Sequence, residues 1–210
     1  LMGILCGEVR PTRGEIRVFG RRVVFRSPRD AIRAGVVMVY QYPSLIPGLT
    51  VLENIYLALS TAGRVKGLRE ARRLAERVVE ETGLEVPLDA YVEELPLGVR
   101  QRAELVKALA LGARVLVLDE PTSVLTPVEA RQLFKTIRGL ASRGVTVVLI
   151  THRLREVVEA ADRVTVLRKG VRVGTRRVSE VTEDELARMM VGEVRPPRRL
   201  AAQRPPGKPV

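Results

Sequence analysis

Three continuous apolar runs along the chain predict an α/β protein with a parallel sheet. The runs cover Val36–Tyr40, Val115–Leu118 and Val145–Ile150 and consist mainly of strand-forming residues. Strands that are apolar on both faces are typical of parallel sheets covered by helices. Between the last two runs, apolar residues recur at helical spacing from Pro127 to Arg143. This βαβ unit should have parallel strands and a right-handed crossover. Its helix is expected to bury Leu133, Phe134, Ile137, Leu140 and Ala141.

Turn and capping signals predict the remaining elements. Further strands are expected at Glu15–Phe19, Arg22–Phe25, Val164–Leu167 and Val171–Thr175. Further helices are expected at Ser27–Gly35, Thr50–Ser60, Leu68–Thr82, from the Leu95–Arg102 stretch to about Leu111, Arg153–Ala160 and Thr182–Gly192, and Leu1–Cys6 resembles the end of a helix. Ser27 is expected to cap the helix that Pro28 begins. Leu74, Val78 and Val79 fit one face of their helix. Capping boxes, in which a threonine and a glutamate bond each other's backbone N–H groups, are expected at Thr50–Glu53, Thr126–Glu129 and Thr182–Glu185.

Length, charge and cysteine content narrow the class of protein. The 210 residues allow one domain with a subdomain and a tail. A net charge of +12 raises nucleic acid or an anionic membrane surface as partners. Aromatic residues make up only 3% of the chain and do not interleave with basic ones, so we expect no nucleic-acid partner. Cys6 is the only cysteine, which excludes a disulfide framework, and its apolar neighbours indicate core packing.

The apolar runs are also too short for a membrane span. None approaches the ~20 residues that cross a bilayer. The first residues show no secretory signal pattern, so we expect a cytosolic chain. The basic, proline-rich stretch Arg195–Lys208 is typical of a linker.

Polar side chains follow the predicted parallel strands at the edge where such sheets carry their chemistry. Asp119 and Glu120 end one strand, Gln41 follows another, and His152 follows a third. Asp119 suits Mg²⁺ held through water, and Glu120 suits a base that accepts a proton from water. His152 suits a contact to a γ-phosphate, and Gln41 a contact to the metal and water. Together they favour phosphoryl transfer to water. The alternatives are a polar turn for the acids, a strand-end histidine bonded within the fold, and an ordinary loop glutamine.

The ordered motifs resemble those of the ATP-binding cassette of ABC transporters. Val117–Thr122 resembles the Walker B motif with its catalytic glutamate, and Gln41 resembles the Q-loop glutamine. Leu95–Arg102 resembles the signature motif, and Thr151-His152 the switch-histidine loop. The resemblance covers residues 1 to about 192. It implies ATP and Mg²⁺, with Glu120 and His152 catalytic, Asp119 and Gln41 at the metal, and Gln41 also at the nucleotide.

The resemblance also implies a fold and a domain plan. The fold would be α/β, a three-layer P-loop NTPase (RecA-like) core with a parallel sheet, a small antiparallel β portion and an inserted helical subdomain. Residues 1–46 would be a partial ATP-binding core, 47–111 the helical subdomain with the signature motif, and 112–192 the rest of the core. Residues 193–210 would be a Pro/Arg-rich linker to a second cassette.

Within the family the chain is similar to tandem-cassette importers of simple sugars and nucleosides. The stretches that carry this likeness are Ser27–Ile32, Leu49–Ile55, Val124–Pro127 and Met189–Gly192. The resemblance implies a second cassette in the same protein, transmembrane permease subunits that the helical part contacts, and a substrate-binding protein that acts indirectly. The location would be the cytoplasmic face of the cell membrane, as a peripheral subunit.

Three departures from the family pattern qualify these expectations. The phosphate-binding loop Gly-x-x-Gly-x-Gly-Lys-Ser/Thr does not occur, so we expect an N-terminally truncated cassette that is inactive alone. Pro96 stands where the family has serine; Pro96, Leu97 and Gly98 would contact nucleotide bound to the partner cassette. Thr126 replaces an aspartate at a nucleotide-binding position, and its alternative role is the helix cap.

Three functions are therefore weighed. The first is an ATP-hydrolysing subunit that energises import of simple sugars or nucleosides. The second is a soluble tandem-cassette translation factor that binds ribosomes, which the basic charge favours and the short proline-rich tail disfavours. The third is a non-hydrolysing cassette, which the intact Asp119, Glu120 and His152 disfavour.

Overall fold

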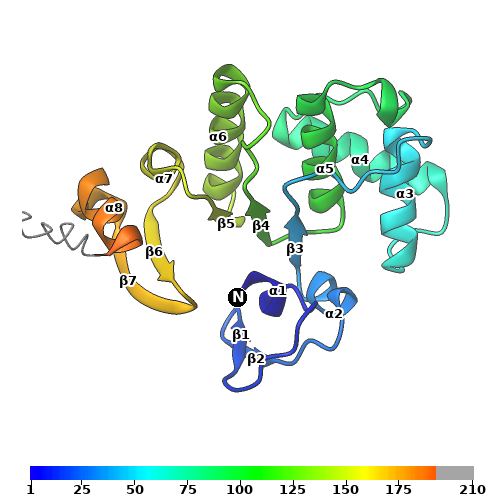
Figure 1. Ribbon diagram of the computed structural model, residues 1–210. Coiled ribbons are helices and arrows are strands. Elements are labelled where there is room, and N and C mark those ends of the chain that lie inside the picture. The colour runs from blue at the N-terminus through cyan, green and yellow to red at the C-terminus, as the bar shows by residue number, and fades with distance from the viewer. Residues whose placement is uncertain (193–210) are drawn as a thin grey trace, which may run out of the picture. The chain divides into compact units, whose positions relative to one another are not determined.

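The structure is a computed structural model that describes residues 1–192. It contains two compact units, of which the first is Leu1–His152 and the second begins at Arg153 (Figure 1). The first unit holds α1 (Met2–Leu5), β1 (Ile16–Val18), β2 (Arg21–Val23), α2 (Pro28–Arg33), β3 (Val36–Val39), α3 (Val51–Thr61), α4 (Leu68–Thr82), a 3₁₀ turn (Val92–Glu94), α5 (Leu97–Ala110), β4 (Val115–Asp119), α6 (Pro127–Ser142) and β5 (Thr146–Ile150). The second holds α7 (Leu154–Ala160), β6 (Arg163–Arg168), β7 (Val171–Arg177), a 3₁₀ turn (Val178–Glu180) and α8 (Glu183–Val191). The predicted linker, 193–210, lies outside the described residues.

A three-stranded parallel sheet in the order β3-β4-β5 forms the centre of the first unit. Its register places Val39 opposite Leu118, and Leu118 opposite Leu149. The prediction of an α/β fold with a parallel sheet is therefore confirmed. Leu116 and Leu118 are fully buried in the central strand. The prediction of a third buried strand is wrong for β5, because β5 has only one described neighbour strand and its residues remain partly exposed.

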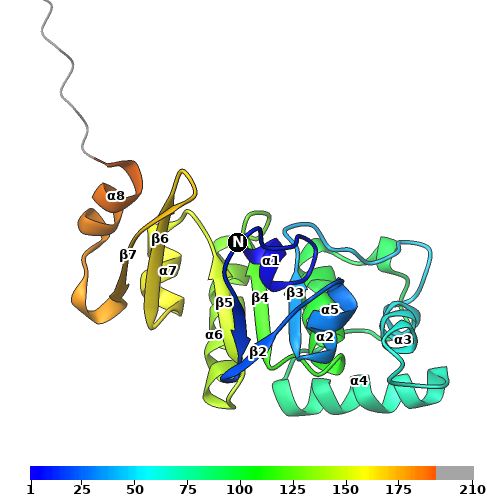
Figure 2. The ribbon, with the colours of Figure 1, turned by 90° about the horizontal axis from the view of Figure 1, so that it is seen from below.

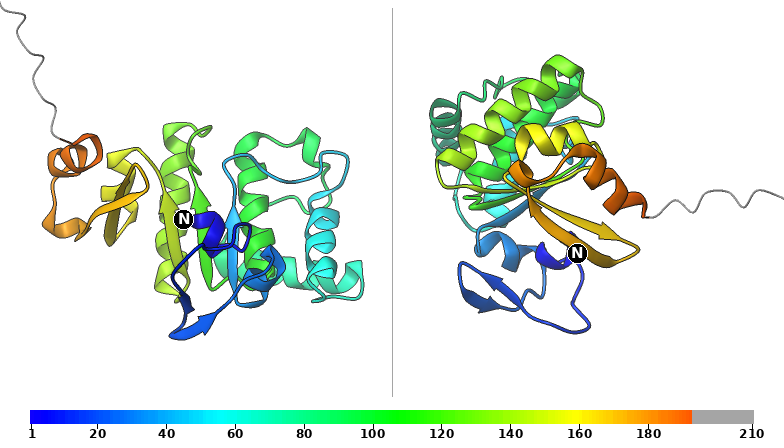
Figure 3. Two further views of the ribbon diagram at one scale, coloured as in Figure 1. Left: turned by 60° about the horizontal axis from the view of Figure 1, so that its bottom comes forward. Right: turned by 90° about the vertical axis from the view of Figure 1, so that its left-hand side faces the viewer.

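Each face of this sheet is covered by a different layer. On one face, Val36 and Val117 join a core with Cys6, Phe25 and Ala31, from the segments around α1, the β1–β2 hairpin and α2. The other face is covered by α5, which contacts β3, and α6, which contacts β5 (Figures 2 and 3). The four larger predicted core residues of α6 are buried, namely Leu133, Phe134, Ile137 and Leu140. Ala141 is exposed, contrary to prediction, because it lies past the end of the buried stripe.

The antiparallel hairpin and the short helix α2 follow the predicted pattern with one correction. β1 pairs with β2, and Pro28 begins α2. Ser27 occupies the N-cap position, but its side chain makes no capping bond to the helix. Asp30 in the first turn instead accepts the Arg26 backbone N–H at 2.9 Å. Cys6 is buried as predicted, and burial followed by the charge of Glu8 raises the pKa of its thiol to about 11.

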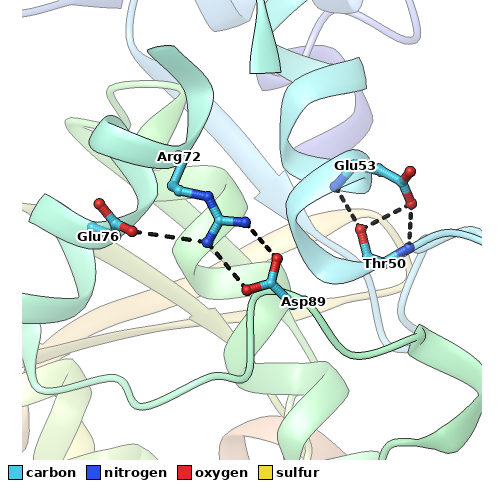
Figure 4. Close-up of polar contacts among 5 residues, drawn as sticks. All are labelled: Thr50, Glu53, Arg72, Glu76 and Asp89. Atoms are coloured by element: carbon cyan, nitrogen blue, oxygen red, sulfur yellow. Dashed lines mark hydrogen bonds and ion pairs between the residues drawn. The ribbon is translucent and has the colours of Figure 1, made fainter. Parts of the chain in front are cut away.

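Helices α3, α4 and α5 pack against one another and form a helical part of the first unit. The Thr50–Glu53 capping box opens α3 as predicted (Figure 4). Arg72 of α4 pairs with Asp89, which ties the helix to the segment before the first 3₁₀ turn (Figure 4). The fully buried side chains of α4 are Ala71 and Ala75. The predicted apolar residues of α4 are only partly buried, namely Leu74, Val78 and Val79.

The second unit has a small core of its own. Its strands β6 and β7 form an antiparallel hairpin with an irregularity at Val166/Leu167. Val157 of α7, Val166 of β6 and Leu186 of α8 pack together. The Thr182 capping box that opens α8 is present as predicted. In residues 1–192, no helix has the length and apolar character needed to cross a membrane.

Candidate functional site

The central strand β4 delivers two carboxylates to one edge of the sheet. Asp119 is its last residue, and Glu120 follows in a turn. The backbone N–H of Glu120 donates to the carbonyl of Ile150 at 2.9 Å, which fixes the turn against the end of β5. Glu120 has φ 43, in the left-handed region that favours glycine. A glutamate held there is strained by roughly 1–3 kcal/mol, and such strain is characteristic of functional sites.

His152 reaches Glu120 from the neighbouring strand. It lies two residues past the end of β5, and the parallel register sets Asp119 opposite Ile150. Its Nδ1 lies 3.0 Å from Oε1 of Glu120. When Nδ1 carries the proton it donates to the carboxylate and leaves Nε2 as an acceptor. The imidazole side chain is 66% exposed and that of Glu120 is 32% exposed, so both are accessible to a ligand.

Asp119 and Glu120 make this edge electrically suited to a cation. Burial, followed by the charge of Glu120, raises the pKa of the Asp119 carboxyl. A divalent cation would remove this repulsion, and carboxylate oxygens are the ligands that Mg²⁺ prefers. Within residues 1–192 no group of three or more His, Cys, Asp and Glu residues is arranged to hold a metal. The site therefore fits Mg²⁺ as an ion that takes its other ligands from water, a bound phosphate or an amide oxygen such as that of Gln41.

Gln41 lies at the same edge without joining the Glu120–His152 pair. It follows β3 after Tyr40 and is partly buried. In the described part of the chain it makes no hydrogen bond to Asp119, Glu120 or His152. The preceding Tyr40 hydroxyl donates to the carboxylate of Glu8, and burial, followed by that bond, raises the pKa of Tyr40. The sequence contains no short-range signal for this long-range contact.

The stretch Pro96–Gly98 forms the start of α5. Pro96 occupies the N-cap position, and Leu97 is the first helical residue. Pro96 and Leu97 are exposed, whereas Gly98 is buried. The first N–H groups of a helix lack intrahelical acceptors and carry partial positive charge. Pro96 and Leu97 therefore leave the start of α5 accessible to an anion, and the Glu129 carboxylate lies beside the buried Gly98.

Thr126 is engaged in the predicted capping box. Its Oγ1 accepts the Glu129 N–H at 3.3 Å, and Glu129 Oε2 accepts the Thr126 N–H at 2.9 Å. The Thr126 hydroxyl also donates to Glu129 Oε2, and the two bonds that this carboxylate accepts lower the pKa of Glu129, the backbone bond contributing most. The structure thus accounts for Thr126 by its helix cap, and its role toward a nucleotide stays a prediction.

Sequence reasoning missed two buried polar side chains on α5. Gln101 is buried, and its amide nitrogen and oxygen have no partner among the described residues. Glu104 is also buried and is bonded to the loop after Gln41. The sequence does contain a signal for these two side chains, because they are polar residues that interrupt the apolar face of an otherwise amphipathic helix. The contact with the distant loop and the ion pair with Lys107 together explain why the protein tolerates Glu104 there.

Comparison with known protein families settles the family. The family model described as ABC transporter matches residues 1–123, more than half of the chain. The chain belongs to the ABC transporter family.

Relatives in this family that the chain matches are named as sugar import proteins. The chain is 46% identical over 192 residues to the ribose import ATP-binding protein RbsA of Chelativorans sp. (strain BNC1), covering 91% of this chain and 38% of the relative. Identity to the protein of the same name from Hahella chejuensis is 45% over 194 residues, covering 91% and 39%. For ribose import ATP-binding protein RbsA 1 of Burkholderia thailandensis it is 43% over 213 residues, covering 100% and 41%. The chain spans about two fifths of the length of these relatives.

Solved structures of the family agree with the fold. A nucleotide-free ATP-binding cassette from an ABC transporter superposes with a TM-score of 0.76 at 22% identity, covering 89% of this chain and 78% of the other. The ADP conformation of the cassette MJ1267 gives 0.73 at 22% identity, covering 91% and 78%. The described core is therefore a P-loop NTPase fold, as the motif order predicts.

Proposed function

We propose that this chain is the ATP-binding and ATP-hydrolysing part of an importer of simple sugars, acting with Mg²⁺ as an ATPase. The observation that carries the proposal is the Glu120–His152 pair at the end of β4, beside Asp119. The titles of the relatives support sugar import over the ribosome-bound alternative. Nucleosides remain the other solute class that the sequence resemblance implies.

Each residue of the pair has a chemical task in this proposal. Glu120 accepts a proton from the water that attacks the terminal phosphate, or it orients that water for the attack. His152 is held by Glu120 through Nδ1, which leaves Nε2 to contact a phosphate oxygen or that water. Transfer of a phosphoryl group to water depends mainly on such positioning and on charge stabilisation.

The remaining site residues bind and position. Asp119 and Gln41 would hold Mg²⁺, which neutralises charge on phosphate oxygens when bound. Gln41, Pro96, Leu97, Gly98 and Thr126 are assigned to nucleotide contacts. We assign Pro96, Leu97 and Gly98 to the nucleotide of a facing cassette, because Pro96 and Leu97 are exposed where the first N–H groups of α5 favour an anion. The Thr126 side chain also caps α6.

The proposed assembly follows from these assignments. Two cassettes would close around ATP, and the helical part, 47–111, would contact permease subunits. Residues 1–46 and 112–192 would form the nucleotide-binding core, and 193–210 would link to a second cassette of the same protein. A substrate-binding protein would act through the permease. The protein would then work at the cytoplasmic face of the membrane as a peripheral subunit.

Glu120→Gln in the complete gene product tests the catalytic assignment. It should keep ATP binding and slow single-turnover hydrolysis at this cassette's site by about 10²–10⁴-fold, the usual loss when a positioned base is removed. Hydrolysis is measured with the facing cassette's own catalytic site disabled. Glu80→Gln, on the exposed face of α4, is the control and should hydrolyse at the parent rate. Unchanged turnover in Glu120→Gln would remove the assignment.

A further inference from the structure

A buried carboxylate on α5 holds the loop that follows Gln41. The Glu104 side chain is 4% exposed. Its Oε1 accepts the backbone N–H of Ser44 at 2.5 Å and the Ser44 hydroxyl at 3.0 Å. Both bonds cross from α5 to a segment 60 residues earlier in the sequence. Ser44 is therefore fixed to α5 by a group that is almost completely buried.

Lys107, one turn further along α5, completes this cluster. Its Nζ lies 2.8 Å from Glu104 Oε2 and donates to the Ser44 hydroxyl at 3.0 Å. A buried carboxylate is unfavourable unless it is paired and hydrogen-bonded. Here both oxygens of Glu104 have partners, so the charge is balanced within the cluster. We call Ser44, Glu104 and Lys107 the α5 latch.

A second buried polar side chain holds the same loop two residues later. Asn54 of α3 accepts the Ile46 N–H at 2.7 Å and donates to the Ile46 carbonyl at 3.1 Å. Because α3 and α5 pack together, residues 44–46 are bonded to the helical part at two points. Only Tyr40–Pro43 remains between the end of β3 and the α5 latch. Gln41 is three residues from Ser44, a span of at most about 11 Å.

We propose that Glu104 is a positioning residue that sets where Gln41 stands relative to the start of α5. This rests on the proposed function, in which Gln41 serves the nucleotide of its own cassette and Pro96–Gly98 serves that of the facing one. Since α5 carries both Pro96–Gly98 and Glu104, a shift of α5 moves Ser44 with it and draws Gln41 along. The α5 latch thereby couples the metal and water at one site to the phosphate contact at the other.

The double variant Glu104→Leu with Lys107→Met removes the latch in the complete gene product. Replacing a buried ion pair by apolar groups of similar size is often neutral for stability, so folding should survive. We expect the Mg²⁺ concentration for half-maximal ATP hydrolysis at this cassette's own site to rise about threefold to tenfold. Changes of that size match coupling between residues in one network. The single variant Glu104→Gln keeps an acceptor for the Ser44 N–H and should therefore retain most of the parent Mg²⁺ dependence.

Two comparisons separate positioning from general loosening of α5. Val106→Ala opens a fully buried site on the same helix and leaves the bonds of the α5 latch in place, so it should lower stability but leave the Mg²⁺ dependence as it was. In a Gln41→Ala background, the latch variant should have no further effect, because Glu104 acts through Gln41. Additive effects, or the same Mg²⁺ shift in Val106→Ala, would overturn the proposal. If Glu120→Gln still slows hydrolysis in that case, the proposed function stands and only the role of Glu104 fails.

Discussion

Gly98→Ala should destabilise the protein even though it places a better helix former in α5. Alanine is favoured over glycine by about 1 kcal/mol in a helix interior, which is an upper bound for Gly98 in the first turn of α5. A Cβ at Gly98, however, would lie 3.1 Å from Cδ of Glu129 and closer still to its Oε1. Glu129 cannot swing away freely, because its other oxygen holds the Thr126 capping box. Overpacking of this kind costs about 1–3 kcal/mol, so the clash should exceed the helix gain.

A matched control isolates that clash. Gly139 lies in the interior of α6, and a Cβ there would meet nothing within 4 Å. Gly139→Ala should therefore show the full gain of about 1 kcal/mol. With Glu129→Ala in the background, Gly98→Ala should also become stabilising, a change of sign. Urea unfolding followed by circular dichroism measures all variants. If Gly98→Ala alone stabilises as much as Gly139→Ala, the contact between the start of α5 and the α6 cap has no energetic weight.

Two other substitutions test the charge and the helix start at the site. Because the folded-state pKa of Asp119 is raised, stability from this group falls as pH rises through that pKa. Asp119→Asn should therefore raise the thermal unfolding midpoint at neutral pH without Mg²⁺. This gain should disappear as the pH falls through the range in which carboxyl groups titrate. The same substitution should abolish Mg²⁺-dependent hydrolysis. An equal gain at acidic pH would contradict this. Pro96→Ser adds an N-cap hydroxyl that α5 lacks and should stabilise it by roughly 1 kcal/mol in urea unfolding. Its effect on turnover should appear at the facing cassette's site, and a change confined to this cassette's own site would refute the assignment of Pro96.

Local signals carried most of the fold prediction. β4 and the Thr50, Thr126 and Thr182 capping boxes depend on residues within a few positions of one another, and all were predicted. The Glu120–His152 contact spans 32 residues and was still predictable, because parallel strands that end together fix where the following residues lie.

Other long-range contacts could not be predicted, since no repeating sequence pattern relates the two residues in each contact. The bond between Ser44 and Glu104, and the fit of Gly98 against Glu129, join segments whose spacing in sequence says nothing about contact. The exposure of β5 was missed for a related reason. An apolar run shows that a strand suits burial, but the number of strands beside it is a property of the whole sheet.

The backbone conformation of Glu120 is unfavourable for a glutamate, although the proposed function requires a carboxylate at this position. A φ of 43 suits glycine or asparagine, and a turn that only closed a strand would be more stable with either. The turn is nevertheless fixed by the Glu120 N–H bond to Ile150, and the same strand end brings His152 within 3.0 Å of the carboxylate. Functional sites characteristically contain residues whose backbone conformation is unfavourable for their type and is held in place by the surrounding structure. The strain at Glu120 thus argues for its chemical role independently of any motif.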